Sequence, residues 1–324
     1  MSRLLTVKSG TGNYVKLRKP ASASCRGARP CAPTKAKIKF EIGGLLNWAK
    51  NFLENLGPAE AKASSERLLE EVLGLERAFL FLNEKEAVSK PLAQRYRGLI
   101  QKRRQRIPVA YLLRKAYFWD EVLEVNEGCL IPRPETEILV ESFIRRSGFT
   151  KKSRFTFLDL GCGSGIIGIA LARNFPQSKV TFCDISKKAL DLTKRNARRY
   201  GLLKRAEFIH SDLFSYWKKR KKKWDAVVSN PPYVADEDWH KLEPELMHEP
   251  ETALRGGKEG LTFYNKISEE AKKFLNPGGV LFFEMGAGQA RKIKSFIVKR
   301  GYKNPEIFKD YLKIDRVLMA RVCV

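Results

Sequence analysis

Hydrophobic positions in this chain change their spacing near residues 107 and 131. Between residues 38 and 107 they recur every three or four positions. The first such run contains Leu45, Leu46, Trp48, Ala49, Phe52 and Leu53. That period places apolar side chains on one face of an α-helix, and runs at 68–73, 75–82 and 92–105 repeat it. We therefore predict a small N-terminal helical bundle over residues 38–107.

Residues 108–130 are rich in aromatic and β-branched side chains instead. The apolar ones are Val109, Tyr111, Tyr117, Phe118, Trp119, Val122 and Val125. This composition predicts strands, and hence a β-hairpin linker between two domains. After it, Pro132 and Pro134 enforce an extended entry, and Thr136 or Glu135 is expected to cap the following helix.

From residue 155 onward, strand-like apolar runs alternate with helical patterns. The expected strands are residues 155–160, 180–184, 206–210, 225–229, 279–284, 306–308 and 316–322. Such alternation predicts an α/β domain over residues 131–324 whose sheet is largely parallel and covered on both faces. Ligands of these sheets bind beyond the carboxyl ends of the strands.

The chain is strongly basic, with a net charge of +26 over 324 residues. Residues 1–40 hold ten Lys or Arg and no acid, and the remainder still carries 52 basic against 36 acidic residues. We expect residues 1–37 to be disordered in isolation. Their composition is typical of a mitochondrial targeting segment, whereas Pro20, Pro30 and Pro33 favour a simple upstream extension. The basic body is compatible with weak RNA or ribosome contact, or with a lysine-rich surface that binds nothing acidic.

Composition also excludes several protein classes. No apolar stretch approaches the roughly 18 residues of a membrane span, so we expect a protein without membrane contact, located in the cytoplasm or, if residues 1–37 are a transit peptide, in mitochondria. The six cysteines form no C-x-x-C pair, and His210, His240 and His248 lack metal-ligand spacing. Neither a metal site nor a disulfide framework is predicted. The basic run at residues 218–223 is expected to be an exposed loop.

A glycine-rich loop follows the first strand of the α/β domain. Gly161, Cys162, Gly163, Ser164 and Gly165 separate that strand from a helix, so the backbone can approach a bulky ligand. Residues 163–168 also satisfy the dinucleotide pattern G-x-G-x-x-G. Asp159, just before the glycines, favours a cationic S-adenosylmethionine over a pyrophosphate, which it would repel.

Two further acids lie at strand ends of the same domain. Asp184 closes the second strand 25 residues after Asp159 and is placed to accept hydrogen bonds from ribose hydroxyls. Asp212 follows the third strand and can accept from an adenine amino group while Leu213 covers the ring; alternatively, Asp212 is a turn residue. These residues extend the predicted methyl-donor site.

The tetrapeptide Asn230-Pro231-Pro232-Tyr233 follows the fourth predicted strand. Proline fixes φ and removes backbone donors, so the Asn230 side-chain oxygen and the Pro231 carbonyl are free to accept two N–H bonds. The Tyr233 ring can lie on the flat face of the same NH2 group. We therefore predict methyl transfer to an amide or exocyclic nitrogen, with positioning as the main catalytic effect.

With these motifs, the chain resembles the HemK-like (PrmC-type) N5-glutamine methyltransferases of peptide chain release factors. The resemblance spans about residues 40–322. It is carried by residues 108–112, 117–119, 130–137, the glycine loop, residues 230–233, 249–254, and the pairs Gly256-Gly257 and Gly260-Leu261. Residues 113–115 replace a usual glycine, and Leu213 stands where tryptophan is common.

The resemblance implies a seven-stranded, Rossmann-like class I methyltransferase domain, and the Gly-Gly-Gln glutamine of a release factor as acceptor. It implies that Asn230, Pro231, Pro232 and Tyr233 are catalytic and bind that glutamine. The implied S-adenosyl-L-methionine site comprises Asp159, Leu160, Gly161, Cys162, Gly163, Gly165, Asp184, Asp212, Leu213 and Asn230. A monomer is expected. The alternative is a nucleic-acid amino methyltransferase acting on adenine N6 or guanine N2, which present a similar planar NH2.

Overall fold

The computed structural model of the chain describes residues 40–323 and divides them into two compact units, one up to Val109 and one from Ala110 onward. The predictions made for residues 1–37, including Cys25 and Cys31, lie outside the described residues. Within residues 40–323, no helix combines the length and apolar character needed to cross a membrane.

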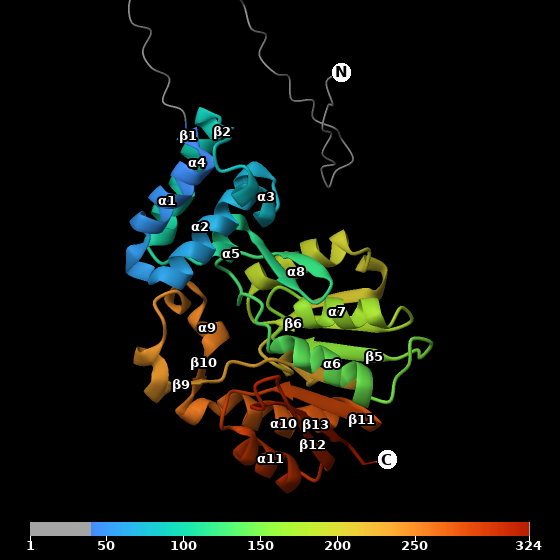
Figure 1. Cartoon of the computed structure of the whole chain (residues 1–324). Helices are drawn as coiled ribbons and strands as arrows, with labels where there is room; N and C mark the ends of the chain where they lie inside the picture. The colour runs from blue at the N-terminus through green and yellow to red at the C-terminus, as the bar shows by residue number, and fades with distance from the viewer. Residues whose placement is uncertain (1–39, 324) are drawn as a thin grey trace, which may run out of the picture. The chain divides into compact units, whose positions relative to one another are not determined.

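The first unit is the helical bundle that the hydrophobic spacing predicts (Figure 1). Its elements are β1 (Phe40–Glu41), α1 (Ile42–Phe52), a 3₁₀ helix (Glu54–Leu56), α2 (Pro58–Leu73), α3 (Arg77–Leu82), β2 (Ala87–Val88) and α4 (Lys90–Arg104). Leu45, Leu46 and Ala49 on α1 are buried. Arg103, in the basic cluster at the end of α4, is also buried, where it donates to Ser64 Oγ at 3.0 Å and pairs with Glu60.

The segment after residue 108 differs in part from the prediction. Val109 and Tyr111 were expected in a strand but lie in a short helix, α5 (Val109–Leu113). The Tyr111 hydroxyl is satisfied by the carbonyl of Cys129, at 2.5 Å, rather than by a strand neighbour. The hairpin itself forms downstream from β3 (Lys115–Phe118) and β4 (Glu121–Glu124), which pair antiparallel. The predicted hairpin is therefore present but shorter.

The second unit contains a seven-stranded sheet in the order β12-β13-β11-β8-β5-β6-β7. Its strands are β5 (Thr156–Leu160), β6 (Lys179–Asp184), β7 (Ala206–His210), β8 (Trp224–Ser229), β11 (Leu275–Glu284), β12 (Lys303–Lys309) and β13 (Asp315–Arg321). Six of them point in one direction, and β13 is antiparallel to its neighbours β11 and β12. All seven predicted strands are confirmed.

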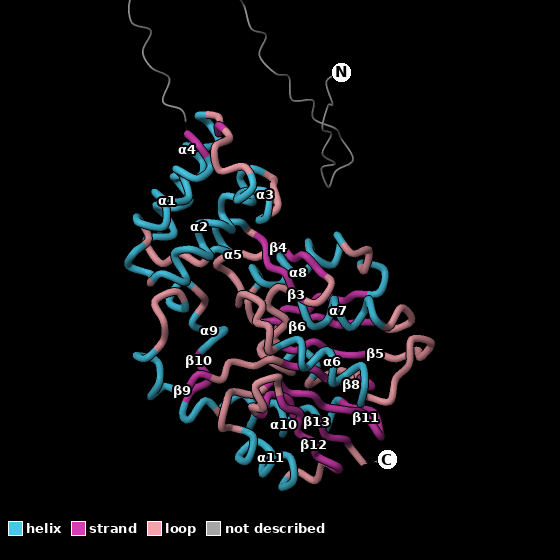
Figure 2. The backbone as a smooth tube through the Cα atoms, in the orientation of Figure 1, coloured by secondary structure: helices cyan, strands magenta, loops and turns pink. Residues whose placement is uncertain are grey.

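Helices cover both faces of this sheet, so each face has its own core (Figures 1 and 2). One face packs against α6 (Thr136–Arg146), α7 (Ile166–Asn174) and α8 (Lys187–Arg199). The other packs against α10 (Thr262–Phe274) and α11 (Ala290–Lys299). The predicted run at residues 218–223 lies in the exposed loop before β8. Chain order reverses between β5 and β8, and such a switch point is where ligands of parallel sheets bind.

Short elements complete the second unit. Two 3₁₀ helices precede β8, at Leu203–Arg205 and Ser215–Trp217. The others follow β8: β9 (Val234–Ala235), α9 (Glu251–Leu254), β10 (Arg255–Gly257), and 3₁₀ helices at Asp236–Lys241, Leu246–His248 and Lys258–Gly260. β9 and β10 pair parallel although about 20 residues separate them. This pairing was not expected from the sequence.

Candidate active site

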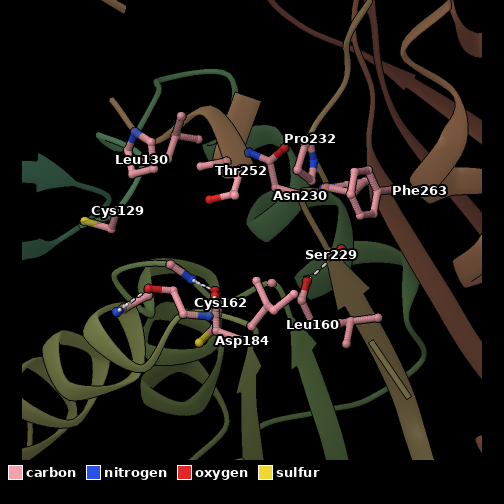
Figure 3. A pocket seen from close by; sticks show the side chains of 18 of the residues that line it. Cys129, Leu130, Leu160, Cys162, Asp184, Ser229, Asn230, Pro232, Thr252 and Phe263 are labelled. Carbon is pink, nitrogen blue, oxygen red and sulfur yellow. Dashed lines mark hydrogen bonds between the residues drawn. The ribbon is translucent and has the colours of Figure 1, made fainter. Parts of the chain in front are cut away.

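A cavity of about 620 Å³ opens at the carboxyl ends of β5, β6 and β8. Its volume lies in the range of small-molecule sites. The lining residues that carry the argument are Leu160, Gly161, Cys162, Gly163, Asp184, Asp212, Leu213, Asn230, Pro231 and Pro232. Thr136, Thr252 and Phe263 line it too. Most residues proposed from the sequence therefore converge on one cavity (Figure 3).

The glycine loop joins β5 to α7 through left-handed backbone. The φ angles are 74° at Gly161, 57° at Gly163 and 84° at Gly165, a region that favours glycine. A Cβ on Gly165 would lie 2.7 Å from Thr193 Cγ2, whereas none of the described residues lies within 4 Å of a Cβ on Gly161 or Gly163. The open side of the loop therefore offers bare backbone to a ligand.

Asp184 is held by the backbone around it. Its Oδ2 accepts from the Gly163 amide at 2.9 Å, and its Oδ1 accepts from the Ser186 amide at 2.8 Å (Figure 3). Burial raises the pKa of this carboxyl, and the backbone hydrogen bonds oppose that rise. Each oxygen keeps a second lone pair, so the carboxylate can still accept from a diol.

Asp159 lies behind the loop rather than on the cavity wall. It is 1% exposed, and its Oδ2 accepts from the Gly168 amide at 2.9 Å. Its Oδ1 is buried without a hydrogen-bond partner in the described chain, and burial raises its pKa to about 7. Gly168 permits this approach, because a Cβ there would lie 2.3 Å from Phe182 and 2.8 Å from Asp159 Oδ2. The uncompensated carboxylate creates a site that favours a cation.

Asp212 and Leu213 line the cavity beyond β7. The Asp212 carbonyl accepts from the Ser215 amide at 3.0 Å, so this residue does make the turn that was its alternative interpretation. Its exposed side chain remains available. Leu213 has φ of 46°, an uncommon value for a branched residue.

Asn230, Pro231 and Pro232 form the opposite wall. The Asn230 Nδ2 donates to Thr136 Oγ1 at 3.3 Å, so the hydroxyl of Thr136 belongs to the site. Glu135 occupies the N-cap position of α6 as predicted, but neither its side chain nor that of Thr136 makes a cap hydrogen bond. The preceding Ser229 hydroxyl anchors the turn to the Leu160 carbonyl at 2.7 Å (Figure 3).

Tyr233, like Asp159 and Gly165, is a predicted site residue that does not line the cavity. Burial, and then the neighbouring Glu284, raise the pKa of its hydroxyl to about 12. Its carbonyl accepts from Gln289 Nε2 at 3.0 Å. The backbone here is tightly enclosed, since a Cβ on Gly260 would lie 2.0 Å from the Tyr233 carbonyl oxygen.

Two buried acids, Glu249 and Glu284, were not predicted from the sequence. Glu249 is 7% exposed, accepts from the Ile131 amide at 3.0 Å and pairs with Arg133. It therefore ties two segments 118 residues apart in the chain. Glu284, at the end of β11, is 1% exposed and has one oxygen without a partner among the described residues. Residues 130–137 and 249–254 carried the resemblance, but no pattern in the sequence indicates these contacts.

The arrangement can hold a nucleoside-bearing cation at one end and a planar NH2 group at the other. Asp184 offers acceptors for hydroxyls, Asp159 an uncompensated negative charge, and Asn230 an amide. Across residues 40–323, no cluster of three or more His, Cys, Asp or Glu side chains could hold a metal ion. The positions of Asp159, Asp184 and Asn230 fit a methyl donor of the sulfonium class.

Known proteins similar to this chain agree with that chemistry. Residues 44–113 match the PrmC N-terminal domain, and residues 134–259 match the methyltransferase small domain. The release factor glutamine methyltransferase of Geobacter sulfurreducens is 35% identical over 284 residues, covering 87% of this chain and 97% of that protein. The enzyme of the same description from Thermodesulfovibrio yellowstonii is 36% identical over 251 residues, 77% of this chain and 88% of its own.

One solved structure of this kind is also similar. It is the protein-(glutamine-N5) methyltransferase (release factor-specific) of Alicyclobacillus acidocaldarius, 28% identical over 62% of this chain and 100% of its own, with a TM-score of 0.40.

Proposed function

The chain belongs to the release factor glutamine methyltransferase family, and on that premise we propose its reaction and the residues that perform it. It transfers a methyl group from S-adenosyl-L-methionine to the side-chain amide nitrogen, N5, of the Gly-Gly-Gln glutamine of peptide chain release factors. Similarity to relatives over most of their length supports the activity.

The orientation of Asn230 carries the proposal. Its NH2 group donates to Thr136 Oγ1 on the protein side, which leaves Oδ1 as an acceptor on the cavity wall. The adjacent Pro231 carbonyl is a second acceptor, and proline supplies no competing donor. Two acceptors side by side suit an NH2 group with two hydrogens. A primary amide has that group, and a hydroxyl does not.

The donor is proposed to lie along the glycine loop. Asp184 accepts from the ribose hydroxyls, Asp212 from the adenine amino group, and Leu213 covers the ring. Leu160, Gly161, Cys162 and Gly163 form the wall against the donor, and Gly165 shapes the loop behind it. Asp159 supplies negative charge behind that wall. When bound, S-adenosyl-L-methionine supplies an electrophilic methyl group on a positively charged sulfur.

The chain's own contribution is positioning and electrostatics. An amide nitrogen is a weak nucleophile because its lone pair is delocalised into the carbonyl. Asn230 Oδ1 and the Pro231 carbonyl accept from its hydrogens, hold the nitrogen toward the methyl group and stabilise the positive charge that develops on it. Pro232 keeps the segment extended. Tyr233 is proposed to contact the flat face of the amide once the substrate is bound.

The remaining parts of the chain have proposed roles as well. Residues 38–107 are proposed as the substrate-recognition domain, residues 108–130 as the linker and residues 131–324 as the methyltransferase domain. We propose a cytoplasmic monomer, with a mitochondrial location if residues 1–37 are a transit peptide. The basic surface supports weak RNA or ribosome contact in addition to the release factor.

Incubation with labelled S-adenosylmethionine and either a release factor or RNA tests the proposal. We expect label in the release factor, lost when its Gly-Gly-Gln glutamine is changed to glutamate. Label confined to RNA would instead establish the alternative, an amino methyltransferase of adenine N6 or guanine N2. A release factor that stays unlabelled beside labelled RNA contradicts the proposal.

A further inference from the structure

We propose that Glu284 is a positioning residue which, with Thr136, locks the Asn230 amide so that its oxygen, and not its NH2 group, faces the acceptor. This inference rests on the proposed function, and it adds a residue outside the Asn-Pro-Pro-Tyr segment. Glu284 does not line the cavity. Its effect on the reaction is therefore exerted through Asn230.

The sheet brings Glu284 next to Asn230. Strands β11 and β8 run parallel with Phe283 opposite Ser229, so the two following residues leave the sheet side by side. Thr136 arrives from α6, which packs on β11. The side chains of Thr136, Asn230 and Glu284, which are far apart in the sequence, thus meet at the carboxyl ends of β8 and β11.

The donors and acceptors of these three side chains favour one orientation of the Asn230 amide. Asn230 Nδ2 donates to Thr136 Oγ1 at 3.3 Å, and the Thr136 and Asn230 side chains lower the pKa of the neighbouring Glu284 carboxyl as hydrogen-bond partners do. An ionised carboxylate accepts and never donates. The NH2 group of Asn230 therefore faces Thr136 and Glu284, and Oδ1 is left for the substrate. Rotating the amide by 180° would set Oδ1 against the carboxylate, with two acceptors facing each other.

Keeping a carboxylate here has a cost that a purely structural residue would avoid. Glu284 is 1% exposed and its Oε2 has no partner among the described residues. Burial raises its pKa to about 7, and the hydrogen bonds from Thr136 and Asn230 oppose the rise. Glutamine would fill the same volume without a charge. An uncompensated acid beside the substrate amide is better explained by a need for an acceptor without a proton.

Within residues 40–323, four ionisable side chains interact electrostatically with Glu284. Glu135, before α6, raises its pKa, and Arg316, on β13, lowers it. The hydroxyls of Tyr233 and Tyr264 lie within its electrostatic influence and stay neutral, because burial and Glu284 raise their own pKa values. As pH falls below about 7, Glu284 gains a proton and becomes a donor, so the rotated amide is no longer disfavoured. The ionised form is the working form.

The first test is Glu284→Gln, with turnover measured at pH 8 and both substrates saturating. Glutamine can donate to Asn230 Oδ1 and so permits the rotated amide. We expect kcat to fall about 10- to 100-fold, less than the roughly 100- to 1000-fold for losing a group that contacts the reacting atoms, with the Kd of the donor within about threefold of wild type. Glu121→Gln is the matched control, since Glu121 is also buried with one unpartnered oxygen but lies away from the cavity. Its kcat should not change.

The second test is the pH profile. In the wild type, kcat should fall as pH drops below about 7, whereas in Glu284→Gln it should stay level, at its lower value, from about pH 6 to 8.5. Saturating both substrates removes any effect of Asp159 on donor affinity. A profile that Glu284→Gln leaves unchanged in shape overturns the inference.

The third test exchanges the hydrogen-bond donor and acceptor between positions 230 and 284. Asn230→Asp alone sets two carboxylates against each other, and adding Glu284→Gln restores one donor facing one acceptor. The second change should therefore raise kcat about tenfold in the Asn230→Asp background although it lowers kcat in the wild type. Equal losses in both backgrounds, or a Glu284→Gln enzyme within about twofold of wild type, refute the role. A wild type that fails to label release factors contradicts the proposed function instead.

Discussion

The two ends of the cavity each have a buried acid behind the wall, and the two acids are held differently. Asp159 is the penultimate residue of β5, and Glu284 is the last residue of β11. Both are 1% exposed, both have an unpartnered oxygen within the described chain, and burial raises the pKa of each to about 7. Asp159 is held by the backbone amide of Gly168, nine residues away. Glu284 interacts with the side chains of Thr136 and Asn230, which are themselves 94 residues apart.

This difference separates two kinds of site construction. The proposed donor end is built at the ends of three neighbouring strands, where backbone amides hold Asp159 and Asp184. The acceptor end is built from side chains that only the sheet order brings together. Changes at the donor end should therefore alter donor affinity, and changes at the acceptor end should alter turnover. The donor Kd and the kcat of variants at each end test that separation.

Asn230→Ala should have the largest effect. Removing the amide takes away an aligned acceptor, and kcat should fall about 100- to 1000-fold, as for loss of an oxyanion-hole group. Titration calorimetry should find the donor Kd within about threefold of wild type, because the donor contacts lie elsewhere. Retained turnover in this variant would refute the role of Asn230.

Asp184→Asn should affect the opposite end. Hydrogen bonds from hydroxyls to a carboxylate contribute about 1.5–3 kcal/mol, so the donor Kd should rise about 10- to 100-fold while kcat at saturation changes little. Asp191→Asn, on the neighbouring helix α8 and outside this cavity, is the control. A loss of kcat with unchanged Kd would break the separation of the two ends.

Gly260→Ala should disturb the acceptor end through the backbone. The added Cβ would lie 2.0 Å from the Tyr233 carbonyl oxygen at a φ of +67°, so the Tyr233 segment must shift. We expect a loss of about 1–3 kcal/mol in the free energy of unfolding, and reduced turnover with the donor Kd preserved. Gly288→Ala is the matched control, because its φ is +80° and a Cβ there meets none of the described residues within 4 Å. Equal losses in both variants would show that backbone strain alone is responsible.

Asp159→Asn should have the smallest effect, and it should increase stability. Burial raises the pKa of Asp159 from 3.8 to about 7, so the folded state binds the proton more tightly than the unfolded state. The stability of the wild type therefore falls as pH rises between these two values, and the asparagine variant lacks this part of the fall. At pH 8 the ligand-free variant should be more stable by about 1 kcal/mol or more, and near pH 3 the gain should vanish.

Thermal unfolding at both pH values measures this difference. The same variant should bind the cationic donor more weakly, since the buried negative charge is gone. A variant that is less stable than wild type at pH 8 would contradict the assignment of Asp159 as an uncompensated carboxylate.

The sequence determined the elements of this protein and the donor end of its site. A period of three to four residues predicted the helices of the N-terminal bundle, and apolar runs alternating with helical patterns predicted all seven sheet strands, because burial constrains each element locally. The glycine loop and Asp184 could be found because the backbone between β5 and α7 and the end of β6 need those residue types. Asn230 to Pro232 were found for a similar reason, since proline constrains its own backbone.

The tertiary structure decided everything that depends on partners far apart in the chain. The Thr136 hydroxyl serves Asn230 instead of capping its own helix, residues 109–113 form a helix where a strand was expected, and Tyr233 lies off the cavity wall. Glu249 and Glu284 were missed because a buried acid is conspicuous only when its surroundings are known. Side-chain polarity at the acceptor end depends on the order of the strands, which hydrophobic periodicity does not specify.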